Sequence, residues 1–158
     1  MPTLPSKTPV TEVPSRRSEE ALRYFSSLLE VETDCWDVHA QLGMGGFVLL
    51  DVRGPDPFKK GHVPGAINLP HGKIVPHALE RFPSDTLFVV YCDGPHCNGA
   101  DRAAIRLASL GRPVKKMIGG VTGWIADGFS LVEEPLGNAS QTTDSAQPFA
   151  VLARGSQG

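Results

Sequence analysis

Two short, unbroken runs of apolar residues stand out in the middle of the chain. Residues 47–50 read Phe-Val-Leu-Leu and lead into Asp51, and residues 86–91 read Thr-Leu-Phe-Val-Val-Tyr and lead into Cys92. A continuous apolar run of this length is typical of a strand covered on both faces, as in a parallel sheet. The pattern therefore predicts two central strands, one ending at Asp51 and the other at Cys92.

Residues spaced as in amphipathic helices precede the first of these strands. Ser18 can cap one helix, and a short extended piece near residues 30–32 follows it. Thr33 or Asp34 can cap a second helix, which ends at a Gly-Met-Gly-Gly stretch. Cys35 shares a face with the apolar residues of this second helix, so it is predicted to be a core residue.

The region between and after the apolar runs alternates in the same way. It contains a turn-rich stretch, a brief extended piece at residues 66–69 and an expected helix around residues 74–82. Residues 100–110 predict another helix, residues 114–118 another strand, and a short last helix carries Trp124, which is expected to pack in the core. This alternation predicts an α/β domain with a mainly parallel sheet flanked by helices on both faces.

The two ends of the chain differ from the middle in composition. Residues 1–17 carry four prolines, and residues 134–158 are rich in Ser, Thr, Gln and Gly. Such segments bury too little apolar area to offset the entropy of an ordered chain. We therefore expect a flexible N-terminal segment at 1–17, one domain at 18–133 and a flexible C-terminal tail at 134–158.

Charge and cysteine content narrow the function further. The formal net charge is −2, which gives no electrostatic reason to expect nucleic acid or an anionic membrane as a partner. The chain has no apolar run long enough to span a membrane and no secretory signal, so a cytoplasmic location is expected. Three cysteines do not suit a disulfide framework, and the thiols are expected to be reduced.

Cys92 is the residue with the clearest chemical potential. Ligands of parallel sheets bind beyond the carboxyl ends of the strands, and Cys92 lies at such an end. Gly94 and Gly99 allow the following loop to turn its amides inward, and the loop leads into the start of a helix, which favours negative charge. We therefore expect the pKa of Cys92 to be lowered and its thiolate to be a nucleophile.

Three stretches together resemble a known family. Residues 49–70 contain Leu-Leu-Asp-Val-Arg-Gly followed by Gly-His-Val-Pro-Gly-Ala, residues 89–92 read Val-Val-Tyr-Cys, and residues 119–124 read Gly-Gly-Val-Thr-Gly-Trp. They are similar to the amino-side motif, the cysteine-bearing strand and the carboxyl-side motif of the rhodanese-like family, the single-domain sulfurtransferases. The resemblance covers the chain from about Ser18 to Phe129.

This resemblance implies a parallel α/β fold and a two-step sulfur transfer that needs no cofactor. The Cys92 thiolate would attack the outer sulfur of a small donor, become a persulfide and pass the sulfur to an acceptor such as cyanide or another thiol. Asp51 and Arg53 would brace the neighbouring loops. The active-site loop would consist of Asp93, Gly94, Pro95, His96, Cys97, Asn98, Gly99 and Ala100.

The loop departs from the family pattern in two ways. It holds about two extra residues, which predicts a wider pocket. Asp93 follows the nucleophile directly, and its carboxylate is expected to oppose a dianionic donor such as thiosulfate and to raise the thiol pKa. The donor therefore stays open, and without an arginine clamp in the loop, phosphate chemistry is not expected.

Cys97 leaves three alternatives open. It could convert a Cys92 persulfide or sulfenic acid into a disulfide, fill the loop as an ordinary thiol, or bind a soft metal with Cys92 and His96. Three ligands within six residues make a poor closed zinc site, so no metal is predicted. A second hypothesis for the whole chain is accordingly a redox or sulfur-relay module that uses Cys92 and Cys97 with a protein partner and does not turn over.

Overall fold

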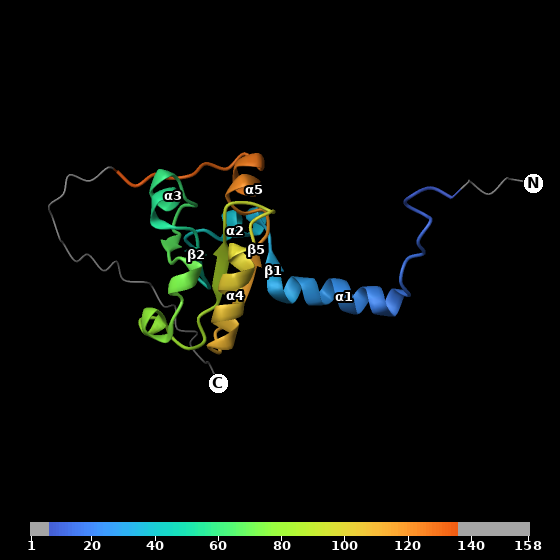
Figure 1. Cartoon of the computed structure of the whole chain (residues 1–158), viewed down its shortest axis with the longest axis horizontal. Helices are drawn as coiled ribbons and strands as arrows, with labels where there is room; N and C mark the ends of the chain where they lie inside the picture. Colours follow the sequence, from blue (N-terminus) through green and yellow to red (C-terminus); the bar gives the residue numbers. More distant parts are fainter. Residues whose placement is uncertain (1–6, 136–158) are drawn as a thin grey trace, which may run out of the picture. The chain divides into compact units, whose positions relative to one another are not determined.

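Within residues 7–135, which the computed structural model describes, strands and helices alternate along the chain (Figure 1). Five parallel strands form one sheet in the order β1-β5-β4-β2-β3. The expected terminal segments 1–17 and 134–158 lie partly outside the described residues. Every neighbouring pair of strands is parallel, which confirms the predicted sheet. The strands are β1 (Glu32–Thr33), β2 (Val48–Asp51), β3 (Ile67–Asn68), β4 (Phe88–Tyr91) and β5 (Val114–Met117).

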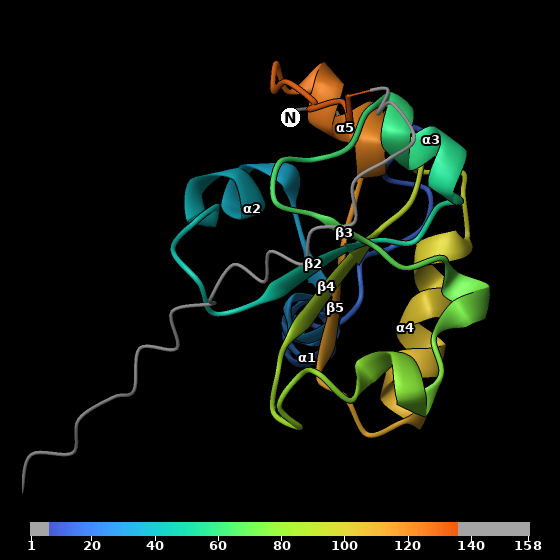
Figure 2. The same ribbon diagram turned by 90° about the vertical axis from the view of Figure 1, so that its left-hand side faces the viewer.

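Helices cover both faces of this sheet, as the strand pattern predicts (Figure 2). Asp34 caps α2 by accepting a hydrogen bond of 2.8 Å from the backbone N of Asp37, so the proposed capping is confirmed. Gly120 opens the last helix, which follows the left-handed Gly119. The helices are α2 (Cys35–Gln41), α3 (Pro55–Lys60), α4 (Gly99–Ser109) and α5 (Gly120–Ala126).

The segment around residues 74–82 differs from the expected helix. It contains the 3-10 turn η2 (Pro76–Leu79), which follows a first 3-10 turn, η1 (His71–Lys73). Hydrogen bonds here span three residues, as from Ala78 N to Val75 O. Pro83 disfavours helical backbone at the residue before it, so the segment does not continue into a longer helix.

Helix α3 lies in the stretch that the sequence analysis assigned to turns. The stretch carries signals that are typical of the two ends of a helix. They are a proline at the first helical position, Asp56 in the first turn, Lys59 and Lys60 in the last turn and Gly61 at the end. Its six residues are too few to show an apolar period, and only Phe58 is buried. The helix was therefore missed because its signals are at its ends and not in its pattern.

Two clusters of buried side chains form the core, one on each face of the sheet. Because successive strand residues point to opposite faces, Val90 and Cys92 pack on the α4 side, whereas Val89 and Tyr91 pack on the side of α2 and α5. Cys35 and Trp124 are buried in the second cluster, as predicted. The strand pattern thus places the Cys92 side chain against α4.

The described residues up to Glu30 form a separate compact unit, and the unit from Val31 onward contains the whole sheet. Helix α1 (Ser18–Val31) is the predicted first helix and begins with acidic residues in its first turn. None of its side chains is buried. No described helix combines the length and apolar character that crossing a bilayer requires.

Candidate active site

Cys92 follows the last residue of β4, at the edge of the sheet where the strands end. In the pairing of β2 with β4, Asp51 lies opposite Tyr91, so the last residues of two neighbouring strands meet there. The Cys92 side chain is buried, with 7% of the residue exposed. The structure therefore places the predicted nucleophile at the position where parallel sheets bind ligands, with only a small part of it open to solvent.

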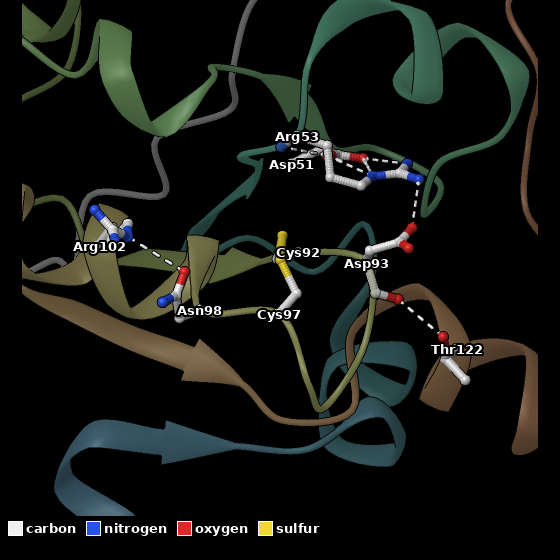
Figure 3. Close-up of a disulfide and its surroundings, with 8 residues drawn as sticks. All are labelled: Asp51, Arg53, Cys92, Asp93, Cys97, Asn98, Arg102 and Thr122. Atoms are coloured by element: carbon white, nitrogen blue, oxygen red, sulfur yellow. Dashed lines mark hydrogen bonds and ion pairs between the residues drawn. A yellow bond between two sulfur atoms is a disulfide. The ribbon is translucent and has the colours of Figure 1, made fainter.

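The loop after Cys92 folds back on itself within five residues. The backbone N of Cys97 donates to the carbonyl of Gly94 at 3.1 Å, which closes a turn. The turn brings the Cα of Cys97 to 6.4 Å from that of Cys92, and the two sulfurs form a disulfide (Figure 3). The expectation that all three cysteines are reduced is thus wrong for this pair, while Cys35 is a free, buried thiol.

Helix α5 holds the start of this loop. The backbone N of Val121 donates to the carbonyl of Cys92 at 3.1 Å, and Thr122 donates to the carbonyl of Asp93 from both its backbone N, at 2.9 Å, and its Oγ1, at 3.0 Å. A Cβ on Gly120, whose φ is +58°, would collide with the Cys92 carbonyl oxygen. The first turn of α5 therefore fixes the backbone that carries Cys92, the predicted nucleophile.

Helix α4 approaches the sulfur of Cys92 from the other side. A Cβ on Gly99, the first residue of the helix, would lie 2.7 Å from Cys92 Sγ and 3.4 Å from Cys97 Sγ. Glycine therefore leaves the space that both sulfurs occupy. The first amides of a helix have no partner within the helix, and its dipole favours negative charge, so a Cys92 thiolate would be stabilised here.

Two pockets are lined by both cysteines. The smaller one, of about 210 Å³, lies against Lys116 and the start of α5. The larger one, of about 770 Å³, is lined by Arg53, His71 and Lys73 among others. Basic side chains thus border both openings to the sulfur pair, although the loop itself contains none but the histidine at position 96.

A buried ion pair joins β2 to the loops around the site. Asp51 is completely buried and accepts hydrogen bonds from Arg53 Nε at 3.0 Å and Nη2 at 2.7 Å. Arg53 Nη2 also donates to the carbonyl of Gly61 at 2.7 Å. The structure thus places both predicted supporting residues together, in a brace that fixes the loop beginning at Gly61.

Tyr91 completes this brace and was not singled out from the sequence. Its hydroxyl donates to Asp51 Oδ2 at 2.8 Å and accepts a bond of 3.0 Å from the backbone N of Val63. Burial, followed by the charge of Asp51, raises the pKa of Tyr91. Burial alone would lower the pKa of Arg53, but its hydrogen bond to Asp51 and the charge of that carboxylate raise it. The feature of the sequence that could have identified Tyr91 is its phenol hydroxyl inside an otherwise apolar strand.

Asp93, whose carboxylate was expected to oppose a dianionic donor at Cys92, pairs with Arg53 instead. Its carboxylate lies 3.5 Å from Arg53 Nη1, and Figure 3 shows it turned toward this arginine and away from the sulfurs. The guanidinium partly neutralises the charge expected to repel an anionic donor. The exposed residues Pro95, His96 and Asn98 lie farther along the loop, and Asn98 Oδ1 accepts a bond of 3.2 Å from Arg102 Nε.

The metal-binding alternative finds no support in the described part of the chain. None of its His, Cys, Asp and Glu side chains form a group of three that could hold a metal ion. Cys92 and Cys97 are bonded to each other, and His96 is exposed.

Comparison with known proteins identifies the family. The model of the rhodanese-like domain matches residues 36–127, which is more than half of the chain. The chain therefore belongs to the rhodanese-like domain family, and its five-stranded parallel sheet with flanking helices is the fold of that family.

Three relatives show how far the similarity extends. The chain is 34% identical to the HTH-type transcriptional regulator Rv0324 of Mycobacterium tuberculosis over 60% of its own length, and it spans 42% of that regulator. The BH2092 protein of Bacillus halodurans has a TM-score of 0.72 and 34% identity, covering 74% of this chain and 87% of that one. A thiosulfate sulfurtransferase of Pseudomonas aeruginosa has a TM-score of 0.54 and 26% identity, covering 72% of this chain and 21% of that one.

Proposed function

We propose that this chain is a sulfurtransferase that carries a sulfane sulfur as a persulfide on Cys92. The observation that supports this most is the position of the Cys92 sulfur, which lies between the end of β4 and the first residue of α4 and lines two pockets. One structural relative is named as a thiosulfate sulfurtransferase, which agrees with this activity. The reaction partners would be a small sulfur donor and a thiol or cyanide.

The reaction begins with the reduced enzyme. The Cys92 thiolate attacks the outer sulfur of the donor. The bond between that sulfur and the rest of the donor breaks, and the rest of the donor leaves as an anion with the electron pair. An acceptor nucleophile then attacks the outer sulfur of the persulfide, and the Cys92 thiolate is the leaving group. The start of α4 stabilises the thiolate in both steps, because it offers unpaired amides and the positive end of the helix dipole.

The basic residues around the pockets indicate where an anionic donor would bind. Lys116 is paired with Asp101 at 2.9 Å, and Arg53 is paired with Asp51 and Asp93. Among the described lysines and arginines that line the two pockets, only Lys73 has no carboxylate partner. We therefore propose that the donor enters through the larger pocket, with its negative charge near Lys73.

The proposal is tested by loading the reduced protein with sulfur. Thiosulfate and, separately, 3-mercaptopyruvate are added under anaerobic conditions to the Cys97→Ser variant, which has no second thiol beside Cys92. Intact-mass measurement is expected to show one added sulfur atom, which cyanide removes as thiocyanate. Cys92→Ser is expected to gain no sulfur and to release no thiocyanate. Full turnover by Cys92→Ser would place the activity elsewhere and overturn the proposal.

A second candidate function is a redox or sulfur-relay module that works with a protein partner and does not turn over. The Cys92–Cys97 disulfide favours it, because a pair of this kind can exchange with the thiols of another protein. The related segment of a protein named as a transcriptional regulator agrees with such a role. If neither donor loads Cys92 while peroxide links it to Cys97, this candidate replaces the enzyme.

Either function needs a supply of reduced thiols, so we propose a cytoplasmic location.

A further inference from the structure

We infer that Cys97 is an internal acceptor that discharges the Cys92 persulfide and releases its outer sulfur as hydrosulfide. This inference rests on the proposed function and names its acceptor and its product. It assigns to the chain a second half-reaction in which a dithiol, and not cyanide, completes the cycle. The product disulfide is the bond that the structure contains.

The geometry of the loop prepares Cys97 for this step. The turn closed by Cys97 N and Gly94 O reverses the chain, and α5 fixes the other end through the carbonyls of Cys92 and Asp93. Both ends of the segment from Cys92 to Cys97 are therefore held by hydrogen bonds that do not involve sulfur. The side chain of Cys97 is directed at Cys92 Sγ, the inner sulfur of a persulfide.

The step balances without an outside oxidant. The Cys97 thiolate attacks Cys92 Sγ, the bond between that sulfur and the outer sulfur breaks, and the outer sulfur leaves with the electron pair as hydrosulfide. The two cysteine sulfurs are oxidised to the disulfide, and the sulfane sulfur is reduced to sulfide. The oxidising equivalents therefore come entirely from the sulfur that the donor delivered.

The reverse change requires an external dithiol, and exposure indicates which sulfur it attacks. Cys97 is partly exposed, whereas Cys92 is buried with 7% exposed. A dithiol therefore reaches the Cys97 sulfur first and displaces Cys92 as the thiolate, at the start of α4, where its negative charge is stabilised. The leaving group of the reduction is thus the nucleophile of the next cycle.

The experiment compares the reduced wild type with Cys97→Ser and follows mass and hydrosulfide together. After removal of reductant and oxygen, each protein receives thiosulfate, 3-mercaptopyruvate or glutathione persulfide. The wild type is expected to lose two hydrogen atoms and release one hydrosulfide per chain. Cys97→Ser is expected to keep the added sulfur, to release at least ~10-fold less hydrosulfide and still to yield thiocyanate with cyanide. Cys35→Ala, which changes the buried free thiol, should release as much hydrosulfide as the wild type.

Two outcomes overturn the inference, and they differ in what they say of the proposed function. A wild type that stays loaded with sulfur, or a Cys97→Ser variant that releases hydrosulfide in full yield, removes Cys97 as acceptor and leaves the sulfurtransferase standing. If no donor loads either protein, the sulfurtransferase fails and the inference fails with it. A disulfide formed without hydrosulfide points to the redox module and also overturns the inference.

Discussion

At the scale of single residues, the geometry of the site depends on Asp51 and Arg53. Asp51 is completely buried, and the Arg53 side chain, 8% exposed, supplies its countercharge. The resemblance to the rhodanese-like family implied that both residues brace the neighbouring loops. It did not predict the third member, Tyr91, because nothing in a continuous apolar strand shows which residue across the sheet it will meet.

Arg53→Ala is expected to lower the free energy of unfolding by about 3–5 kcal/mol, because it leaves a buried carboxylate without its partner. Chemical denaturation measures this. The matched control is Arg17→Ala, which breaks an exposed pair with Glu20 and should cost about 0–1 kcal/mol. Equal effects of the two variants would show that Asp51 does not need its partner.

Gly99→Ala is expected to abolish sulfur loading while the protein stays folded. The new Cβ would lie 2.7 Å from Cys92 Sγ, so the sulfur must move from its place beside α4, whereas alanine suits a helix better than glycine. Intact-mass detection of the persulfide, with Cys97→Ser present in both glycine variants, and circular dichroism measure the two effects. Gly123→Ala, whose Cβ meets Cys35 Sγ at an ordinary 3.5 Å, should load normally. Normal loading by Gly99→Ala would contradict the close approach.

Cys35 predicts a loss of stability in alkaline solution. Burial, with smaller contributions from Asp127 and Asp34, raises the pKa of this thiol from 9.0 to about 11. As the pH rises, the unfolded chain loses the thiol proton before the folded protein does. The contribution of the neutral thiol to the free energy of unfolding is therefore fully present below pH 9.0 and disappears as the pH rises to about 11. Relative to Cys35→Ala, the wild type should lose on the order of 1–2 kcal/mol across this interval in urea unfolding. Val38→Ala, a buried neighbour that does not titrate, should run parallel to the wild type.

At the scale of elements, the two apolar runs predicted β2 and β4 well, because a strand covered on both faces leaves a clear mark in the sequence. Helices α2, α4 and α5 were predicted from apolar spacing and from glycines at their ends. Helix α3 and the 3-10 turns were not predicted, because they are too short to show an apolar period and have prolines at or near their ends. The contact of α5 with the loop could not be predicted, since it joins segments that are far apart in the chain.

Thr122→Val tests how α5 fixes the loop. The substitution removes the hydroxyl that donates to the Asp93 carbonyl and keeps the shape of the side chain. The free energy of unfolding should fall by about 1 kcal/mol, and amide exchange should become faster across residues 93–98. Thr33→Val is the control, because the described structure gives its side chain no hydrogen bond. Unchanged exchange in the loop would show that the two backbone bonds suffice.

At the scale of the molecule, the catalytic proposal concerns only the unit from Val31 onward. Both core clusters consist of residues from Cys35 on, and the family match begins at residue 36. The sequence predicts one domain from Ser18 to residue 133, and the spacing in α1 predicts a helix without showing to which unit it belongs.

A chain that begins at Val31 is therefore expected to fold and to load sulfur on Cys92 within about two-fold of the full chain, since it keeps every residue of the core. Near-ultraviolet circular dichroism and the intact-mass experiment measure folding and loading. An unfolded product would show that the unit containing the sheet needs the residues before it.

The alternation of side chains along β4 has a consequence for how this protein can change during evolution. Tyr91 and Cys92 are adjacent, yet one serves the brace and the other the sulfur site on the opposite face. Inserting or deleting one residue ahead of them would exchange their directions, sending the sulfur toward Trp124 and the phenol toward α4. Loops elsewhere in this fold can lengthen by one residue at a time, but the length of β4 ahead of Tyr91 can change only by two residues at a time.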